Sequence, residues 1–199
     1  MNQEQHDHFI ALLRATNRDG IENVIAWLEK SDFFTAPAST RFHGAYEGGL
    51  LEHSLNVHKA FENILQGVLF DFSIDKSSVT IAALLHDICK ANTYKVAKRW
   101  RKDKQNQWEQ YDTYEFDETE PMGHGEKSVM ILMSLGLKLT KSEMYMIRWH
   151  MGGFDESKMA LSNAMTKHPE IVLMHSADLF ASYMLDGNRG DSSNELHGS

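Results

Sequence analysis

A histidine and an aspartate stand side by side at the end of an apolar segment, and this pair constrains the fold more than any other feature. Residues 81–85 read Ile-Ala-Ala-Leu-Leu and are followed by His86 and Asp87. A helix that is apolar on every side is buried in the core. Burying a charged carboxylate is costly unless a cation or strong hydrogen bonds compensate it. The pair therefore indicates a bound metal ion at the end of a buried helix.

The composition is that of one soluble globular domain. The chain has 199 residues, of which 42% are hydrophobic, which is enough for a proper core. No apolar run approaches the ~20 residues that a membrane helix needs, and the polar, acidic start of the chain is unlike a signal peptide. A single cysteine, Cys89, excludes an internal disulfide and fits a reducing cytosol. We therefore expect a cytoplasmic protein without a membrane segment.

Most of the chain is predicted to be helical. Two start signals are visible, Asp19-x-x-Glu22 and the capping box from Thr140 to Glu143. On the predicted helix of residues 50–65, His53 shares the apolar stripe and points inward. We predict helices over residues 5–15, 21–30 and 50–65, one after Asp75 that carries the doublet, one from the capping box to residues 150–153, and one from Pro169 that includes Asp178.

Residues 93–116 break the helical pattern and predict an inserted β-hairpin. The stretch is rich in Tyr, Trp, Val and Thr around a polar centre. Its lysines and arginines, with Trp100 and Trp108, could hold a single nucleic-acid strand through phosphate contacts and stacking. We favour the alternative that following acidic residues pair with these cations, while the tryptophans pack against the body or a second subunit.

The domain organisation is predicted to be simple. One domain covers residues 1–186, because no internal repeat or linker interrupts it. Residues 187–199 are rich in Gly, Ser and Asn, which predicts a flexible polar tail.

Four further residues join the doublet as candidate metal ligands: His53, His124, His150 and Asp178. Each lies on a predicted helix or at a helix end. Taken singly, each has another explanation. His53 could be a hydrogen-bonded core histidine, and Asp178 could be a buried acid with a structural role. His124 could simply lie at a helix N-terminus, and His150 could be favoured at a helix C-terminus by the helix dipole.

The order of these residues resembles that of a known family. The arrangement His53, His86-Asp87, Asp178 in a helical chain resembles the HD-domain metal-dependent phosphohydrolases. His124 and His150 look like the additional histidines of the dinuclear branch. The resemblance covers residues 42–183, and segments 48–54 (Gly-Gly-Leu-Leu-Glu-His-Ser) and 84–90 (Leu-Leu-His-Asp-Ile-Cys-Lys) are similar to the HD domain of certain bacterial 3′–5′ exoribonucleases. Cys89 stands where that family often has glycine.

The resemblance implies an all-α HD-domain helical bundle with a small inserted β-hairpin and a two-metal site. The first metal would be held by His53, His86, Asp87 and Asp178, and Asp87 would bridge to a second metal held by His124 and His150. Imidazole and carboxylate ligands suit two divalent ions of Mn, Fe, Zn, Co or Ni, with Mg as an alternative.

Several cationic or imidazole groups are candidates for contact with substrate. Lys90 is expected to face the substrate phosphate, as in many family members, or else to be a solvated lysine at a helix C-terminus. Arg41 and His43 precede the His53 helix and are expected to orient phosphate or protonate a leaving group, unless they are merely solvated. Arg148 has a weaker case, because side chains two residues apart diverge on a helix.

The predicted function is hydrolysis of a phosphomonoester or phosphodiester bond in a nucleotide or short nucleic-acid substrate. Asp87 and Lys90 are the predicted catalytic residues, and the net charge of −8 argues against general coating of DNA. Two alternatives remain: a mixed-valent di-iron oxygenase on the HD fold, and a non-catalytic nucleotide-binding module. The sequence leaves open whether the protein is a homodimer.

Overall fold

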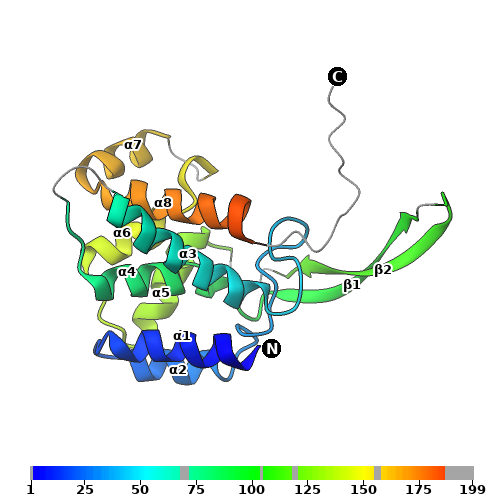
Figure 1. Cartoon of the computed structure of the whole chain (residues 1–199), viewed down its shortest axis with the longest axis horizontal. Helices are drawn as coiled ribbons and strands as arrows, with labels where there is room; N and C mark the ends of the chain where they lie inside the picture. Colours follow the sequence, from blue (N-terminus) through cyan, green and yellow to red (C-terminus); the bar gives the residue numbers. More distant parts are fainter. Residues whose placement is uncertain (1, 68–71, 104, 118–120, 155–157, 187–199) are drawn as a thin grey trace.

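A helical body with a projecting two-stranded arm forms the structure, as Figure 1 shows. The computed structural model describes residues 2–67, 72–103, 105–117, 121–154 and 158–186. The predicted all-α bundle with an inserted hairpin is confirmed. The predicted tail of residues 187–199 lies outside the described residues. No helix in the described part of the chain combines the length and apolarity that crossing a bilayer demands.

The helices begin and end close to where the sequence predicts. Two helices are not among those predicted: α5, which follows the hairpin, and α7, which has a weak apolar pattern and a single buried residue. The helices are α1 Gln3–Ala15, α2 Ile21–Leu28, α3 Gly49–Gly67, α4 Lys76–Leu85, α5 His124–Ser134, α6 Lys141–Trp149, α7 Lys158–Lys167 and α8 Glu170–Phe180. Shorter turns of helix are η1 Ile88–Lys90, η2 Gly152–Phe154 and the π-helical η3 Ala181–Leu185.

The Asp19-x-x-Glu22 signal places the N-cap of α2 one residue too early. The N-cap of α2 is Gly20, with φ 90°, and it makes no side-chain capping bond. Asp19 instead pairs with Lys138, 3.0 Å away. A Cβ at Gly20 would lie 2.2 Å from the carbonyl oxygen of Gly136, so this close approach of two loops requires glycine.

Helix α4 is the centre of the core. Residues 81–85 have no exposed surface, as the apolar sequence predicts. Helices α1, α3 and α6 pack around α4, and α8 packs against α3 and α6. The ends of these central helices carry the candidate ligands.

Glu143 ties α6 to α4 and so fixes how their C-terminal ends meet. The predicted capping box is confirmed, with the Thr140 side chain and Glu143 bonding each other's backbone. The fully buried Glu143 carboxylate also accepts a hydrogen bond of 2.6 Å from the Ser78 hydroxyl of α4. Arg18, which precedes α2, pairs with the same carboxylate at 2.8 Å. A charge buried at this depth is stable only because each oxygen has a partner.

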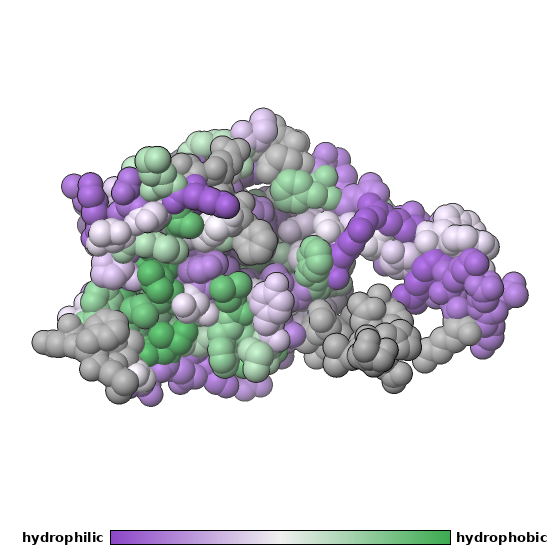
Figure 2. Space-filling model, turned by 90° about the horizontal axis from the view of Figure 1, so that it is seen from above, coloured by the Kyte–Doolittle hydropathy of each residue, from purple (hydrophilic) through white to green (hydrophobic). Residues whose placement is uncertain are grey.

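The hairpin consists of β1 Tyr94–Lys102 and β2 Trp108–Phe116, paired antiparallel from Tyr94 opposite Phe116 to Lys102 opposite Trp108. It extends away from the helices as an arm (Figure 1), and Figure 2 shows hydrophilic residues gathered at its far end. Trp100 and Trp108 are 63% and 65% exposed, so the expectation that they pack against the body of the same chain is wrong. The strands extend beyond the helical body, so their outer residues, including both tryptophans, have none of the described helices to pack against.

Candidate metal centre

Three helices bring one group of candidate ligands together in the core. His53 comes from α3, Asp178 from α8, and His86 is the C-cap of α4. The Nε2 atom of His53 lies 3.2 Å from Nε2 of His86 and 3.3 Å from Oδ1 of Asp178. Both imidazoles are buried, and Asp178 is nearly so. The three side chains offer ligand atoms that lie within 4.8 Å of one another.

Asp87 joins this group to a further histidine. Its Oδ2 atom lies 3.3 Å from Nε2 of His86 and 3.8 Å from Nε2 of His53. Its Oδ1 atom faces the other way and lies 3.4 Å from Nε2 of His150, the C-cap of α6. The two carboxylate oxygens therefore face different imidazoles, as a bridging ligand would require.

The far side of each imidazole ring has a partner that sets its orientation. Nδ1 of His86 lies 2.9 Å from the Ala83 carbonyl oxygen, and Nδ1 of His150 lies 2.6 Å from that of Ile147. A carbonyl oxygen can only accept, so each Nδ1 donates and the neutral ring presents its Nε2 lone pair to the centre. This arrangement is typical of metal-binding histidines.

Asp186 plays the same part for His53, and sequence reasoning missed it. Its Oδ2 atom lies 2.7 Å from Nδ1 of His53, and its Oδ1 atom accepts a hydrogen bond of 2.9 Å from Asn56. His53 and Asn56 lie one turn apart on α3, which is a weak hint that one partner serves both. Nothing in the sequence identifies that partner as a residue 133 positions away.

The carboxylates make the centre strongly attractive to a cation. Burial opposes protonation of His53, but hydrogen bonds to Asp178 and Asp186 outweigh it and raise the pKa of His53 to about 9. Burial opposes ionisation of Asp87, yet the charge of Lys90 and the neighbouring imidazoles hold its pKa well below the usual range. The pKa of Asp178 is likewise lowered, against burial, by its hydrogen bond to His53. Both carboxylates are therefore ionised at neutral pH.

Two buried ligand atoms lack any hydrogen-bond partner among the described residues. They are Oδ1 of Asp87 and Nε2 of His150. Leaving such an atom unsatisfied costs about 1–3 kcal/mol. A divalent cation coordinated by both atoms would satisfy them, and imidazole with carboxylate is a donor set that suits Mn, Fe, Co, Ni or Zn. The residues present thus fit a bound metal.

His124 is the candidate ligand that the compact groups of ligand atoms found in the described parts of the chain do not include. It opens α5, and its Nδ1 atom lies 3.3 Å from Sγ of Cys89, whose thiol has a pKa raised by burial to about 12. The assignment of His124 to a second metal stays a prediction.

Lys90 is buried against the centre, so its reading as a solvated lysine is wrong. Its ammonium group lies 2.7 Å from Oδ2 of Asp87 and donates a hydrogen bond of 2.8 Å to the Ala38 carbonyl oxygen. The side chain is 9% exposed. Burial lowers the pKa of Lys90, but the negative charge of Asp87 and other neighbouring groups outweighs burial and raises the pKa above its usual value. The ammonium group therefore stays charged.

The other predicted substrate contacts are His43, Arg41 and Arg148, and of these the structure places His43 next to the cluster. The ring of His43 lies 5.0 Å from that of His53, and its Nε2 atom lies 3.4 Å from the Ser182 hydroxyl. Burial and the positive charge of neighbouring His53 and Lys90 lower the pKa of His43 to about 4. Arg41 is exposed in the loop before α3.

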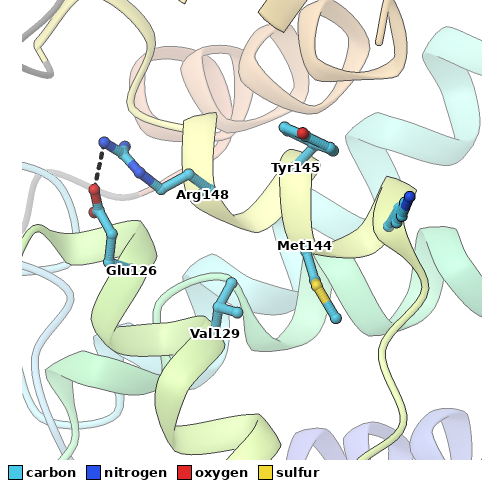
Figure 3. A pocket seen from close by; sticks show the side chains of 6 residues that line it. Glu126, Val129, Met144, Tyr145 and Arg148 are labelled. Carbon is cyan, nitrogen blue, oxygen red and sulfur yellow. Dashed lines mark ion pairs between the residues drawn. The ribbon is translucent and has the colours of Figure 1, made fainter. Parts of the chain in front are cut away.

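Arg148 points into a different pocket, as Figure 3 shows. It pairs with Glu126 across the space between α6 and α5, and its guanidinium lies 4.1 Å from the centre of the Trp149 ring. The pocket has a volume of about 440 Å³ and a largely apolar floor that includes Val129 and Met144. The structure therefore does not bring Arg148 into the cluster around Asp87.

Comparisons with known proteins agree with this geometry. The HD domain family model matches residues 50–182. A dihydroneopterin 2',3'-cyclic phosphate phosphodiesterase of Methanocaldococcus jannaschii is 39% identical over 62 residues, which cover 30% of this chain and 24% of that protein. No solved structure gave a significant match. The family match contains the clustered ligands from His53 to Asp178 but ends before Asp186. The chain therefore belongs to the HD-domain family, the metal-dependent phosphohydrolase superfamily that its histidine and aspartate order resembles.

Proposed function

We propose that this protein is a divalent-metal-dependent phosphohydrolase that cleaves a phosphomonoester or phosphodiester bond of a nucleotide or oligonucleotide. One observation carries the proposal: three buried imidazoles, each held at Nδ1, direct Nε2 toward ionised Asp87 and Asp178. The relative from Methanocaldococcus is named as a phosphodiesterase, which supports hydrolysis at phosphorus.

The metal ligands follow from the cluster. His53, His86, Asp87 and Asp178 would hold one ion, and Asp87, His150 and the predicted His124 would hold a second. When bound, such ions lower the pKa of water and neutralise phosphoryl oxygens, which supplies the nucleophile and stabilises developing charge. The protein supplies a fixed set of ligand atoms in a site largely shielded from water.

Lys90 has two linked roles in this proposal. Its contact with Oδ2 holds the Asp87 carboxylate ionised and oriented, with the Ala38 carbonyl fixing the ammonium from the other side. The same positive charge lies beside the ligands and would favour negative charge building on a phosphoryl group. His43, at the edge of the cluster, and Arg41, in the same loop, are the remaining candidates to orient that group.

A turnover screen tests the proposal. Purified protein is stripped with chelator, reloaded with Mn, Fe, Co, Ni, Zn or Mg, and assayed on bis-p-nitrophenyl phosphate, mononucleotides, cyclic dinucleotides and short oligonucleotides. We expect metal-dependent phosphate-ester hydrolysis that Asp87→Asn abolishes together with at least one bound ion. Asp7→Asn, an exposed aspartate that also follows a histidine, is the matched control and should behave as the unaltered protein.

Two results would overturn the proposal. The first is an absence of hydrolysis with every metal and substrate, and the second is full metal occupancy in folded Asp87→Asn protein. Oxygen consumption by the iron-loaded protein, without hydrolysis, would assign the chain to the di-iron oxygenases instead.

A further inference from the structure

The register of the hairpin divides its side chains between two faces. Successive residues of a strand point to opposite sides, and residues directly opposite each other share a side. One face, called here the aromatic face, consists of Tyr94, Val96, Lys98, Trp100 and Lys102 of β1 with Trp108, Gln110, Asp112, Tyr114 and Phe116 of β2.

The opposite face is occupied by ion pairs. Arg101 lies 2.6 Å from Glu109, and Arg99 lies 3.5 Å from Glu115. Lys95 pairs with Asp117 at the base of the arm. The positive charges of this face are therefore largely compensated within the hairpin, as the acidic residues of the sequence suggest.

The aromatic face is open to solvent. Besides the two exposed tryptophans, Val96 is 71% exposed and Phe116 is 45% exposed. Trp100 and Trp108 are diagonal neighbours across the two strands, because Trp108 pairs with Lys102. A two-stranded hairpin gains little stability alone, so large exposed aromatic side chains at its outer end indicate a binding surface.

Two lysines alternate with these aromatic rings. Lys98 makes no ion pair with any residue that the structure describes, although Asp112 stands opposite in register. The ammonium of Lys102 lies 5.6 Å from the centre of the Trp108 ring. Rings that stack on bases and cations that meet phosphates are the usual means of binding a single nucleic-acid strand. Lysine is depleted at protein–protein interfaces, which makes a second protein chain a poorer match for this face.

The aromatic face begins beside the metal centre. The Phe116 ring lies 5.7 Å from that of Tyr94 and 6.2 Å from that of His124. The Tyr94 hydroxyl donates a hydrogen bond of 3.4 Å to the Ala38 carbonyl oxygen, which also accepts from Lys90. From there the nine residues of β1 extend on the order of 25–30 Å, enough for several nucleotides.

We propose that the aromatic face of the hairpin binds a single-stranded oligonucleotide and leads its end to the metal centre. The inference rests on the proposed hydrolase function and names its substrate class. Bases stack on Trp100 and Trp108, and the backbone phosphates meet Lys98 and Lys102. Residues 94–116 carry six lysines and arginines against four acidic residues, whereas the whole chain has a formal net charge of −8, so a polyanion is attracted to the arm more than to the rest of the protein.

Binding and turnover are tested on separate substrates. Binding of dye-labelled oligothymidylate and oligouridylate, each about ten nucleotides long and so within the usual range of site sizes, is measured by fluorescence anisotropy in chelator. Both tryptophans are exposed, so Trp100→Ala/Trp108→Ala should fold normally. We expect this variant to bind ~10-fold or more weakly, the loss typical of removing one stacked base. Its hydrolysis of bis-p-nitrophenyl phosphate should stay unchanged, because that substrate is too small to reach the arm.

Matched controls lie in the same hairpin. Tyr111→Ala removes an aromatic ring from the opposite face and should leave binding intact, whereas Trp100→Phe/Trp108→Phe should restore most of it. Lys98→Gln/Lys102→Gln should weaken binding and reduce its salt dependence, and Arg99→Gln should do so much less.

The outcomes separate the inference from the proposed function. Unchanged oligonucleotide binding in the double tryptophan variant, with normal turnover of the small substrate, overturns the inference alone. If that variant instead changes a dimer to a monomer without weakening the oligonucleotide complex, the face is a contact between two copies and the inference is wrong. Failure of the unaltered protein to turn over any phosphate ester overturns the proposed function.

Discussion

At the scale of single residues, the candidate centre depends on atoms that lie behind the ligands. A histidine ring turns freely unless its second nitrogen is held, and a rotated ring presents no lone pair to a metal. Backbone carbonyls hold His86 and His150, and a carboxylate holds His53. The two carbonyls belong to the backbone of the helices that carry those histidines, so a substitution cannot remove them. The partner of His53 is the side chain of Asp186, which a substitution can remove.

Asp186→Asn is therefore expected to weaken metal binding rather than folding. An amide in place of the carboxylate is a weaker acceptor for the Nδ1 proton, and loss of such partners typically costs 10–100-fold in metal affinity. Competition with a coloured chelator measures the affinity, and thermal melting of the metal-free protein measures the fold. Asn56→Ala, which removes the second bond to Asp186, should show a smaller effect in the same direction. Unchanged affinity in Asp186→Asn would mean that the ring is held by packing alone.

Lys90→Met is expected to destabilise the metal-free protein. Methionine keeps much of the aliphatic stem but leaves the Asp87 carboxylate buried without its cation, and breaking a buried pair costs about 3–5 kcal/mol. A bound divalent ion compensates the same carboxylate, so adding metal should recover much of the stability. Catalytic efficiency should still fall by ~10²-fold or more, the scale of losing one preorganised donor. Chemical denaturation with and without metal separates the two effects, and equal losses in both would contradict the pairing with Asp87.

The raised pKa of His53 predicts that metal binding becomes tighter as pH rises. Without metal the folded protein holds a proton on His53 up to a pKa of about 9, and a metal must displace it. Below that pH the apparent affinity should therefore increase by as much as ~10-fold per pH unit between about pH 6 and 8. Calorimetry in buffers of different ionisation enthalpy should detect about one proton released per ion at pH 7. Affinity independent of pH in this range would show that the ring is already neutral.

At the scale of helices, α4 and α6 meet the metal centre with their C-terminal ends, and Glu143 sets their relative position from the opposite ends. Its carboxylate caps α6, accepts from Ser78 of α4 and pairs with Arg18. The ligands His86 and His150 then follow at the C-cap positions. Because Glu143 joins the N-terminal ends of α4 and α6, the C-terminal ends of the two helices, with His86 and His150, are held in a fixed relative position.

Glu143→Ala is expected to reduce the free energy of unfolding by ~3 kcal/mol or more. It removes a helix cap and leaves the Arg18 guanidinium largely buried without its partner. Urea denaturation provides the measurement. Glu22→Ala is the control, because the Arg14–Glu22 pair is exposed on both sides and its loss should hardly change stability. Comparable losses of unfolding free energy in both variants would show that Glu143 contributes no more than an exposed ion pair.

At the scale of the whole molecule, the candidate ligands connect four helices that are distant in sequence. A metal bound by them is bound only in the folded state, so it should stabilise the entire domain. At a free-ion concentration of about 100 Kd the gain is about 2.7 kcal/mol, or a rise in Tm of roughly 5–10 °C. Differential scanning calorimetry before and after chelation tests this, with Asp87→Asn as the variant in which the shift should vanish. A shift that survives in Asp87→Asn would place the ion elsewhere.

The sequence by itself determined the features that are written in neighbouring residues. The apolar run at 81–85 predicts the buried helix, the capping box at Thr140 predicts the start of α6, and a stretch rich in Tyr, Trp, Val and Thr around a polar centre predicts the hairpin. Each of these signals depends on contacts within a few positions. The resemblance to the HD-domain family likewise depends on the order of the ligands along the chain, which can be recognised without knowing the distances between them.

Only the tertiary structure decided which distant groups touch. It placed Asp186 on His53, turned Lys90 inward to Ala38 and Asp87, and directed Arg148 toward Glu126 and away from the centre. It also left the tryptophans exposed on the arm, where a pairing pattern alone allowed packing on the body. Periodicity and capping describe how one segment folds upon itself. The packing of α3, α4, α6 and α8 determines which side chains share the centre, and that packing depends on the whole chain at once.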